Sequence, residues 1–154
     1  MAKATIFDSL KQDHDQHRKL IARMTDAAGD PDRLAKLFDQ FRVEVTAHAA
    51  AEEETLYATM LARPDLREDA QHSVAEHKEI DDYLEALGEK KVGSTEWNAT
   101  FAKLRKRYLH HIEEEEQEMF PDAASELTDA QEKALAERFA KRKPAELERA
   151  AESA

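Results

Sequence analysis

Residues 41–56 read FRVEVTAHAAAEEETL, and residues 104–119 read LRKRYLHHIEEEEQEM. In both stretches apolar side chains recur every three or four residues and then give way to a histidine and, four residues later, a glutamate. This spacing is typical of one face of an α-helix, with the histidine one turn from the glutamate. Two helices are therefore predicted to turn a polar pair toward the core, and these pairs are His48 with Glu52 and His111 with Glu115.

Two further amphipathic segments show the same polar interruption. The apolar stripe of the first segment breaks at His14 and His17, and that of the third breaks at His77, with Asp81 one turn later. His14 and His48 are 34 residues apart, as are His77 and His111, and an offset of 63 relates the two halves. The repeat predicts two helical hairpins related by a pseudo-twofold axis.

Capping residues, glycines and prolines divide the chain into helices joined by short turns. The predicted helices run from Thr5 to Gly29, from Asp30-Pro31 to about Leu61, from a cap at Asp65 to Gly88, from a cap at Ser94 to Phe120, and, after Thr128, from Asp129 to about Arg142. We therefore predict an all-α fold, an antiparallel up-down-up-down four-helix bundle with a short fifth C-terminal helix. Residues 1–125 are assigned to the bundle, and residues 126–154 to the short helix and a charged tail that packs on or extends from it.

The net charge, the lack of cysteine and the lack of long apolar stretches exclude several classes of function. The 154 residues carry a formal net charge of −11, which argues against nucleic acid or an anionic membrane as a partner. There is no cysteine, so disulfides, thiolate nucleophiles and sulfur-ligated metals are excluded. No stretch has the length and apolarity of a membrane span or a secretory leader. We predict a cytoplasmic protein that is a monomer or a weak homo-oligomer.

The interrupting polar residues share one level of the predicted bundle. Counted from the turns near residues 30, 64 and 92, they differ in height by only a few ångströms at ~1.5 Å per residue. Two carboxylates facing each other in a core would each cost several kcal/mol unless a cation lies between them. Imidazole and carboxylate together suit iron, manganese or zinc. The predicted metal ligands are His14, His48, Glu52, His77, His111 and Glu115.

Other polar residues are given less specific roles. His17 lies one turn from His14, where it either fills the core or supports a ligand from the second shell. His72 and His110 lie off the stripes and are predicted to face solvent. The acidic run 113–116 is interpreted as a solvated helix face apart from Glu115, and run 52–54 likewise apart from Glu52.

The pattern of His, His-x-x-x-Glu, His, His-x-x-x-Glu on four helices resembles the hemerythrin-like proteins with the HHE cation-binding domain. The resemblance covers about residues 5–121 and includes Met119-Phe120-Pro121 after the second motif. It implies a cofactor of two non-haem iron ions, bridged by the two carboxylates and an oxo or hydroxo group. It also implies dioxygen, peroxide or nitric oxide as small ligands.

One position departs from the respiratory members of this family, which carry a second histidine one turn after the third-helix ligand. This chain has Asp81 there. Asp81, water or a tyrosine could take that coordination position. Tyr108 lies on the stripe one turn before His111, and Tyr57 is a less well-oriented candidate. Since a carboxylate, phenolate or open position favours ferric iron, peroxide or redox handling is favoured over oxygen transport.

Several functions stay open at the level of sequence. The first is an enzyme with catalase-like or peroxidase activity at a di-iron centre. The second is a module that senses oxygen, nitric oxide or iron, or stores iron, without turnover. Ferritin-like di-iron enzymes are disfavoured because their Glu-x-x-His pairs are missing from this sequence.

Overall fold

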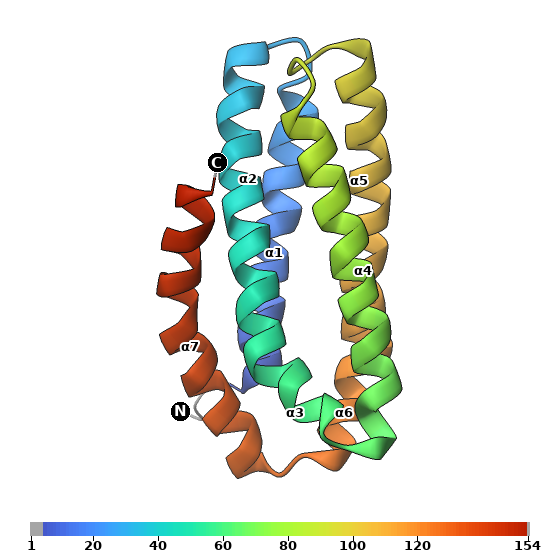
Figure 1. Ribbon diagram of the computed structural model, residues 1–154, viewed down its shortest axis with the longest axis vertical. Helices are drawn as coiled ribbons and strands as arrows, with labels where there is room; N and C mark the ends of the chain where they lie inside the picture. Colours follow the sequence, from blue (N-terminus) through green and yellow to red (C-terminus); the bar gives the residue numbers. More distant parts are fainter. Residues whose placement is uncertain (1–4, 154) are drawn as a thin grey trace.

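The computed structural model describes residues 5–153, and all regular structure in this range is helical (Figure 1). The elements are α1 (Ile6–Asp26), α2 (Pro31–Glu52), η1 (Glu53–Tyr57), α3 (Ala58–Leu61), α4 (Pro64–Gly88), α5 (Thr95–Glu114), η2 (Glu115–Met119), α6 (Phe120–Glu126) and α7 (Asp129–Glu152). Helices α1, α2, α4 and α5 alternate in direction and form the bundle (Figure 1). The predicted all-α, up-down-up-down architecture is confirmed.

Side-chain caps fix most helix starts. Thr5 and Thr128 form capping boxes with Asp8 and Gln131, three residues further on. Ser94 accepts from the backbone N–H of Trp97 at 3.2 Å, and Asp30 caps α2 in the same way. The predicted cap at Asp65 is wrong: α4 already begins at Pro64, because a fixed φ and a missing N–H suit proline to the first helical position.

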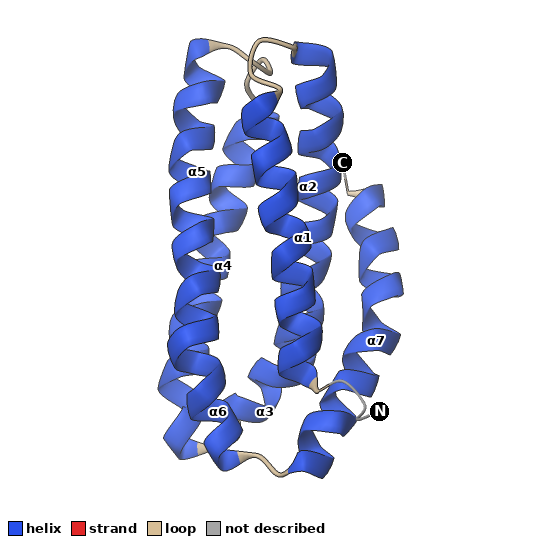
Figure 2. Ribbon diagram, turned by 180° about the vertical axis from the view of Figure 1, so that it is seen from behind, coloured by secondary structure: helices blue, strands red, loops and turns tan. Residues whose placement is uncertain are grey.

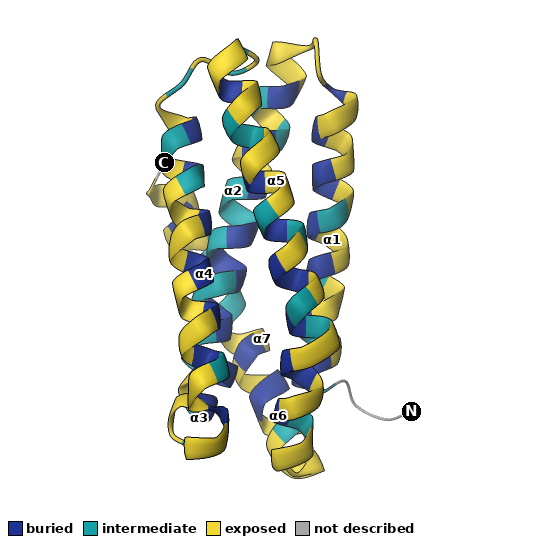
Figure 3. Cartoon of the chain, turned by 90° about the vertical axis from the view of Figure 1, so that its right-hand side faces the viewer, coloured by how far each residue is buried: buried dark blue, intermediate teal, exposed yellow. Residues whose placement is uncertain are grey.

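The apolar core consists of two clusters, one toward each end of the bundle. One contains Ile6, Leu10, Leu56, Met60 and Phe120, and the other contains Ile21, Met24, Phe41, Trp97 and Leu104 among its largest members. The buried faces of the helices turn inward along the whole length of the bundle (Figure 3). Buried histidines and glutamates lie between the two clusters, as the level of the polar interruptions predicts.

The buried face of α4 differs by one residue from the predicted stripe. Ser73, His77 and Ile80 are buried, whereas Val74 is 37% exposed and Asp81 is exposed. The spacing from His77 to the next core position is three residues, so Ile80 takes the place that the prediction gave to Asp81. Asp81 therefore points away from the polar layer.

Two π-helical turns, η1 and η2, follow the glutamates of the two motifs. Each places one more residue in a turn than an α-helix does, which rotates the following side chains. Tyr57 and Phe120, five residues after Glu52 and Glu115, are consequently buried at 0% and 2% exposure. The helix predicted to end at Phe120 continues as α6, which tolerates Pro121 in its first turn.

Helix α7 is longer than predicted and packs against α1 and α2 (Figure 2). It passes through Pro144 and ends at Glu152 instead of near Arg142. Leu135 and Phe139 are buried, and Arg42 of α2 donates to the carbonyl of Ala150 at 3.1 Å. These contacts offset the hydrogen bond that a proline removes from a helix. The domain boundary near residue 125 stays a prediction.

Among residues 5–153, no helix combines the length and apolarity needed to cross a bilayer.

Candidate metal centre

The six predicted ligands meet in the polar layer, and each is at most 5% exposed. His14 comes from α1, His77 from α4, and the two His-x-x-x-Glu pairs from α2 and from α5 with η2. Their side chains form two groups of atoms within 4.8 Å of one another, namely His14, His48 and Glu52, and Glu52, His77, His111 and Glu115. Because Glu52 belongs to both groups, the two groups of ligand atoms adjoin each other. The role of these six residues as metal ligands stays a prediction.

The two carboxylates lie between the imidazoles of opposite hairpins. Glu52 Oε1 lies 3.6 Å from His48 Nε2 and 3.3 Å from His77 Nε2. Glu115 Oε1 lies 2.8 Å from His111 Nε2 and 3.7 Å from His14 Nε2. Each carboxylate thus faces one histidine of its own hairpin and one histidine of the other hairpin.

Each of the four histidines has a carboxylate on its outer nitrogen. Nδ1 of His48 lies 2.8 Å from Asp13, and Nδ1 of His111 lies 2.9 Å from Glu76. The first contact lies within the first hairpin and the second within the second hairpin. The offset of 63 residues relates Asp13 to Glu76 and His48 to His111. An ionised carboxylate only accepts, so Nδ1 of each ring carries a proton and Nε2 is the nitrogen that points into the centre.

The other two contacts cross between hairpins. Nδ1 of His14 lies 2.7 Å from Glu116 of η2, and Nδ1 of His77 lies 3.3 Å from Glu53 of η1. The interpretation of runs 113–116 and 52–54 as solvated faces is therefore wrong for Glu116 and Glu53. The offset of 63 relates these two residues to each other, and this was the signal in the sequence that could have indicated them.

Cations hold three of these outer carboxylates. Lys143 of α7 donates to Asp13 at 2.6 Å, Arg18 donates to Glu116 at 2.9 Å, and Arg107 contacts Glu76. A chain of cation, carboxylate and imidazole fixes ring orientation more firmly than a single contact would. The Lys143 contact shows that α7 supports the centre, a role that the sequence pattern did not indicate.

Unpartnered polar atoms provide the test of whether a cation fits. Within residues 5–153, the buried side-chain atoms that lack a hydrogen-bond partner include Nε2 of His14 and His48, both carboxylate oxygens of Glu52 and Oε1 of Glu115. Leaving such groups unpaired costs about 1–3 kcal/mol each, and more for charged groups. Because all of them face the same small space and are nitrogen and oxygen donors, they fit a metal ion there.

Without a metal ion, the pKa values of the buried carboxyl groups and imidazoles determine the charge of the centre. Burial, and then the neighbouring Glu115, raise the pKa of Glu52 well above its usual range. Burial also raises the pKa of Glu115, but His111, Glu52 and His14 together outweigh this and hold it well below that range. Burial lowers the pKa of His48 to about 4. Burial likewise disfavours charged His111, but Glu115 and Glu76 raise its pKa to about 9. A metal ion at this centre would therefore compete with protons on Glu52 and His111.

The three residues considered as possible additional ligands lie at different distances from the centre. Tyr57 donates to Glu115 Oε2 at 2.8 Å, and its hydroxyl lies 3.5 Å from His77 Nε2. The hydroxyl of Tyr108 instead lies 2.6 Å from Nδ1 of His17, whose ring packs edge-on against His48. Tyr57 therefore reaches the centre directly, Tyr108 reaches it only through His17, and the exposed Asp81 lies outside it.

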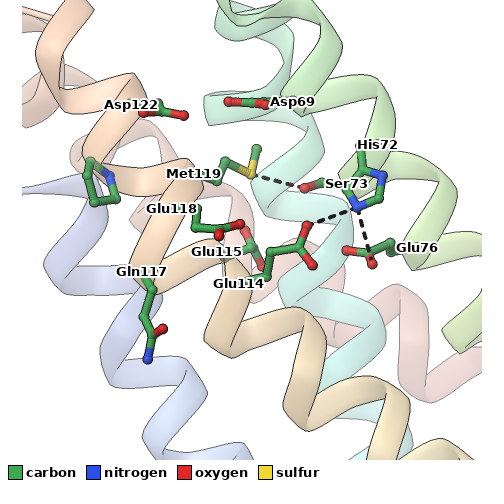
Figure 4. A pocket seen from close by; sticks show the side chains of 11 residues that line it. Asp69, His72, Ser73, Glu76, Glu114, Glu115, Gln117, Glu118, Met119 and Asp122 are labelled. Carbon is green, nitrogen blue, oxygen red and sulfur yellow. Dashed lines mark hydrogen bonds and ion pairs between the residues drawn. The ribbon is translucent and has the colours of Figure 1, made fainter.

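A cavity of about 430 Å³ opens between α4 and the α5–η2–α6 segment, and Glu115 is one of its lining residues (Figure 4). His72 lies at this cavity with its side chain 57% exposed and pairs with Glu114, so the prediction that it faces solvent is confirmed. His110 is also exposed, at 62% of its side chain. The centre is thus reached from the surface on the side of α4 and η2.

Comparison with known proteins agrees with this geometry. The family model of the hemerythrin HHE cation-binding domain matches residues 5–123. The crystal structure of a hemerythrin HHE cation-binding domain-containing protein from Mycobacterium kansasii is similar, with a TM-score of 0.83 and 21% sequence identity over 96% of this chain and 90% of that one. The comparison with curated proteins found no match. With the family model covering most of the chain, this protein belongs to the hemerythrin HHE cation-binding domain family.

Proposed function

We propose that the protein is a non-haem di-iron protein that reacts with peroxide or binds dioxygen at a carboxylate-bridged pair of ions. The observation that supports this proposal is the presence of Glu52 in both groups of ligand atoms, as expected for a carboxylate that joins two bound ions. Imidazole and carboxylate without sulfur suit iron in either common oxidation state. A pair of bound iron ions would supply the redox chemistry toward peroxide and dioxygen.

Peroxide handling is favoured over oxygen transport because of the side chain beside His77. Tyr57 lies there in place of a further imidazole, and burial, with Glu115 next, raises its pKa well above the usual range. Without a cation the phenol stays protonated and donates to Glu115. A hard phenolate oxygen at a metal ion would stabilise the ferric state, which disfavours reversible oxygen carriage. The cavity that reaches Glu115 leaves room for a small molecule. A cytoplasmic location and a monomeric or weakly associated state are part of the same proposal.

Iron analysis and peroxide turnover test the proposal together. Protein expressed in iron-replete medium is expected to contain about two irons per chain and to evolve oxygen from added peroxide. His111→Ala is expected to abolish both, because it removes the imidazole 2.8 Å from Glu115. Fewer than one iron per chain would contradict the di-iron proposal, and an inert diferric protein would contradict the peroxide activity.

Replacement of the phenol next to His77 tests the ferric preference. Tyr57→Phe is expected to remove a phenolate-to-iron charge-transfer band from the visible spectrum and to shift the reduction potential upward, while the iron content stays near two per chain. Tyr108→Phe is the matched control, because its hydroxyl is bonded to His17, and its spectrum is expected to keep the band. A wild-type spectrum without such a band would rule out Tyr57 as a ligand.

A sensing role is the second candidate, and the contacts of α7 favour it. Lys143 of α7 donates a hydrogen bond to Asp13, and Asp13 is hydrogen-bonded to His48. The ring of Phe139 lies 6.0 Å from that of His48. A change at the centre therefore has a direct path to an outer helix. If the diferric protein leaves peroxide intact but its oxidation state alters hydrogen exchange in α7, sensing is supported over turnover.

A further inference from the structure

The cavity beside Glu115 is strongly acidic (Figure 4). Of the eleven side chains that line it, six are aspartate or glutamate, one is histidine, and none of these described residues is lysine or arginine. Asp69 and Asp122 lie near each other there, and burial together with Asp122 raises the pKa of Asp69. Carboxylates in a hollow with protein walls concentrate cations from solution.

A set of metal-binding atoms lies at the outer part of this cavity. His72 Nε2 lies 2.9 Å from Glu114 Oε1 and 3.4 Å from Glu76 Oε2. One imidazole and two carboxylates within 4.8 Å are a donor set for a divalent first-row metal. Arg107 already pairs with Glu76, and His110 Nε2 lies 3.2 Å from Glu114 Oε2, so His72 Nε2 and Glu114 Oε1 are the two donor atoms offered to a cation in the cavity.

The inner part of the cavity ends on a buried carboxylate of which one oxygen accepts no hydrogen bond. Glu115 is 1% exposed and lines the cavity, and its Oε1 accepts no hydrogen bond within the described chain, although His111 Nε2 lies 2.8 Å away. This carboxylate belongs equally to the cavity and to the buried centre. A cation bound at His72 and Glu114 therefore has an acidic path that leads to a ligand of the centre.

We propose that this cavity is the route by which a divalent cation enters the buried centre, with His72 and Glu114 as the transient ligands at its mouth. The proposal rests on the proposed function, since it needs a metal destination. His72 is 57% exposed and Glu114 is 27% exposed, so both are accessible to a hydrated ion. The six ligands of the centre are at most 5% exposed and need such a route.

The rate of iron loading tests this route. Metal-free protein is mixed with Fe²⁺ in air in a stopped-flow instrument, and growth of the ferric absorbance is followed. His72→Ala and Glu114→Gln, made separately, are expected to slow loading about tenfold and to weaken its dependence on ionic strength, with the final iron content unchanged. The control is Glu44→Gln, an equal change of charge at a different hollow, lined by Lys19 and Arg23 among others, and it should load at the wild-type rate.

A second measurement detects the mouth site itself. Mn²⁺ is titrated into iron-loaded protein while the EPR signal of the free ion is recorded. One weakly bound Mn²⁺ is expected for the wild type and none for His72→Ala. Wild-type loading rates in both cavity variants, with full final iron, would overturn the entry route alone. Fewer than one iron in the wild type would instead refute the di-iron proposal, and the Mn²⁺ titration of that protein would still decide whether the mouth binds a cation.

Discussion

Glu52→Gln is expected to empty the centre of iron and at the same time to stabilise the metal-free protein. Glu52 is fully buried, both of its oxygens lack a hydrogen-bond partner, and it is the carboxylate that belongs to both groups of ligand atoms. An amide cannot replace a bridging carboxylate, so iron content should fall below about one per chain. The same change removes a buried carboxyl group that destabilises the metal-free fold when it is ionised.

The sign of the stability effect follows from the raised pKa of Glu52. A carboxyl group whose pKa is higher in the folded chain than in the unfolded chain destabilises the fold once the pH exceeds the unfolded value. At pH 7 the glutamine variant should therefore unfold with a free energy about 1–3 kcal/mol higher than the wild type, measured by urea denaturation with a chelator present.

Glu53→Gln is the matched control for this variant. Glu53 is the next residue, its side chain is 39% exposed, and its Oε1 lies 3.3 Å from the outer nitrogen of His77. We expect this variant to keep most of its iron and to show little change in stability. Two irons per chain in Glu52→Gln would contradict the role of Glu52 as a shared ligand.

Loading with iron is expected to raise the melting temperature by on the order of 10 °C. The centre joins α1, α2, α4 and α5 at the level between the two apolar clusters, so a cation there binds only the folded chain. Metal at a thousand times its dissociation constant adds about 4 kcal/mol. In a domain of this size 1 kcal/mol corresponds to about 2–4 °C.

Calorimetry with and without a chelator measures this shift. Removal of iron by the chelator should return the loaded protein to the melting temperature of the metal-free protein. The melting temperature of Glu52→Gln should be the same with and without the chelator. Equal melting temperatures for loaded and metal-free wild type would indicate that the metal is not bound in the core.

The sequence was sufficient to predict the bundle and the polar layer because local rules govern both. The caps at Thr5, Ser94 and Thr128 satisfy backbone groups within three residues, and the hydrophobic period selects the inward face of each helix. His48 and Glu52 share that face over a single turn, so their juxtaposition depends on helix pitch alone.

The parts that could not be predicted depend on geometry beyond one helix. Tyr57 lies five residues after Glu52 and faces the centre only because η1 is a π turn. Glu116 reaches His14 across 102 positions of sequence, a contact that only the packing of the bundle creates. At Asp81, spacings of three and four residues fit the same helical period, and Ile80 satisfies the core instead.

The crossed contacts of the outer carboxylates also bear on how such a chain could arise. Glu116 of the second hairpin orients His14 of the first, and Glu53 of the first hairpin orients His77 of the second. Neither hairpin alone contains a complete set of ligands with their supporting carboxylates. Two identical copies of one hairpin, paired about a twofold axis, would complete each other. The offset of 63 is therefore what duplication and fusion of the gene for a self-pairing hairpin would leave in the sequence.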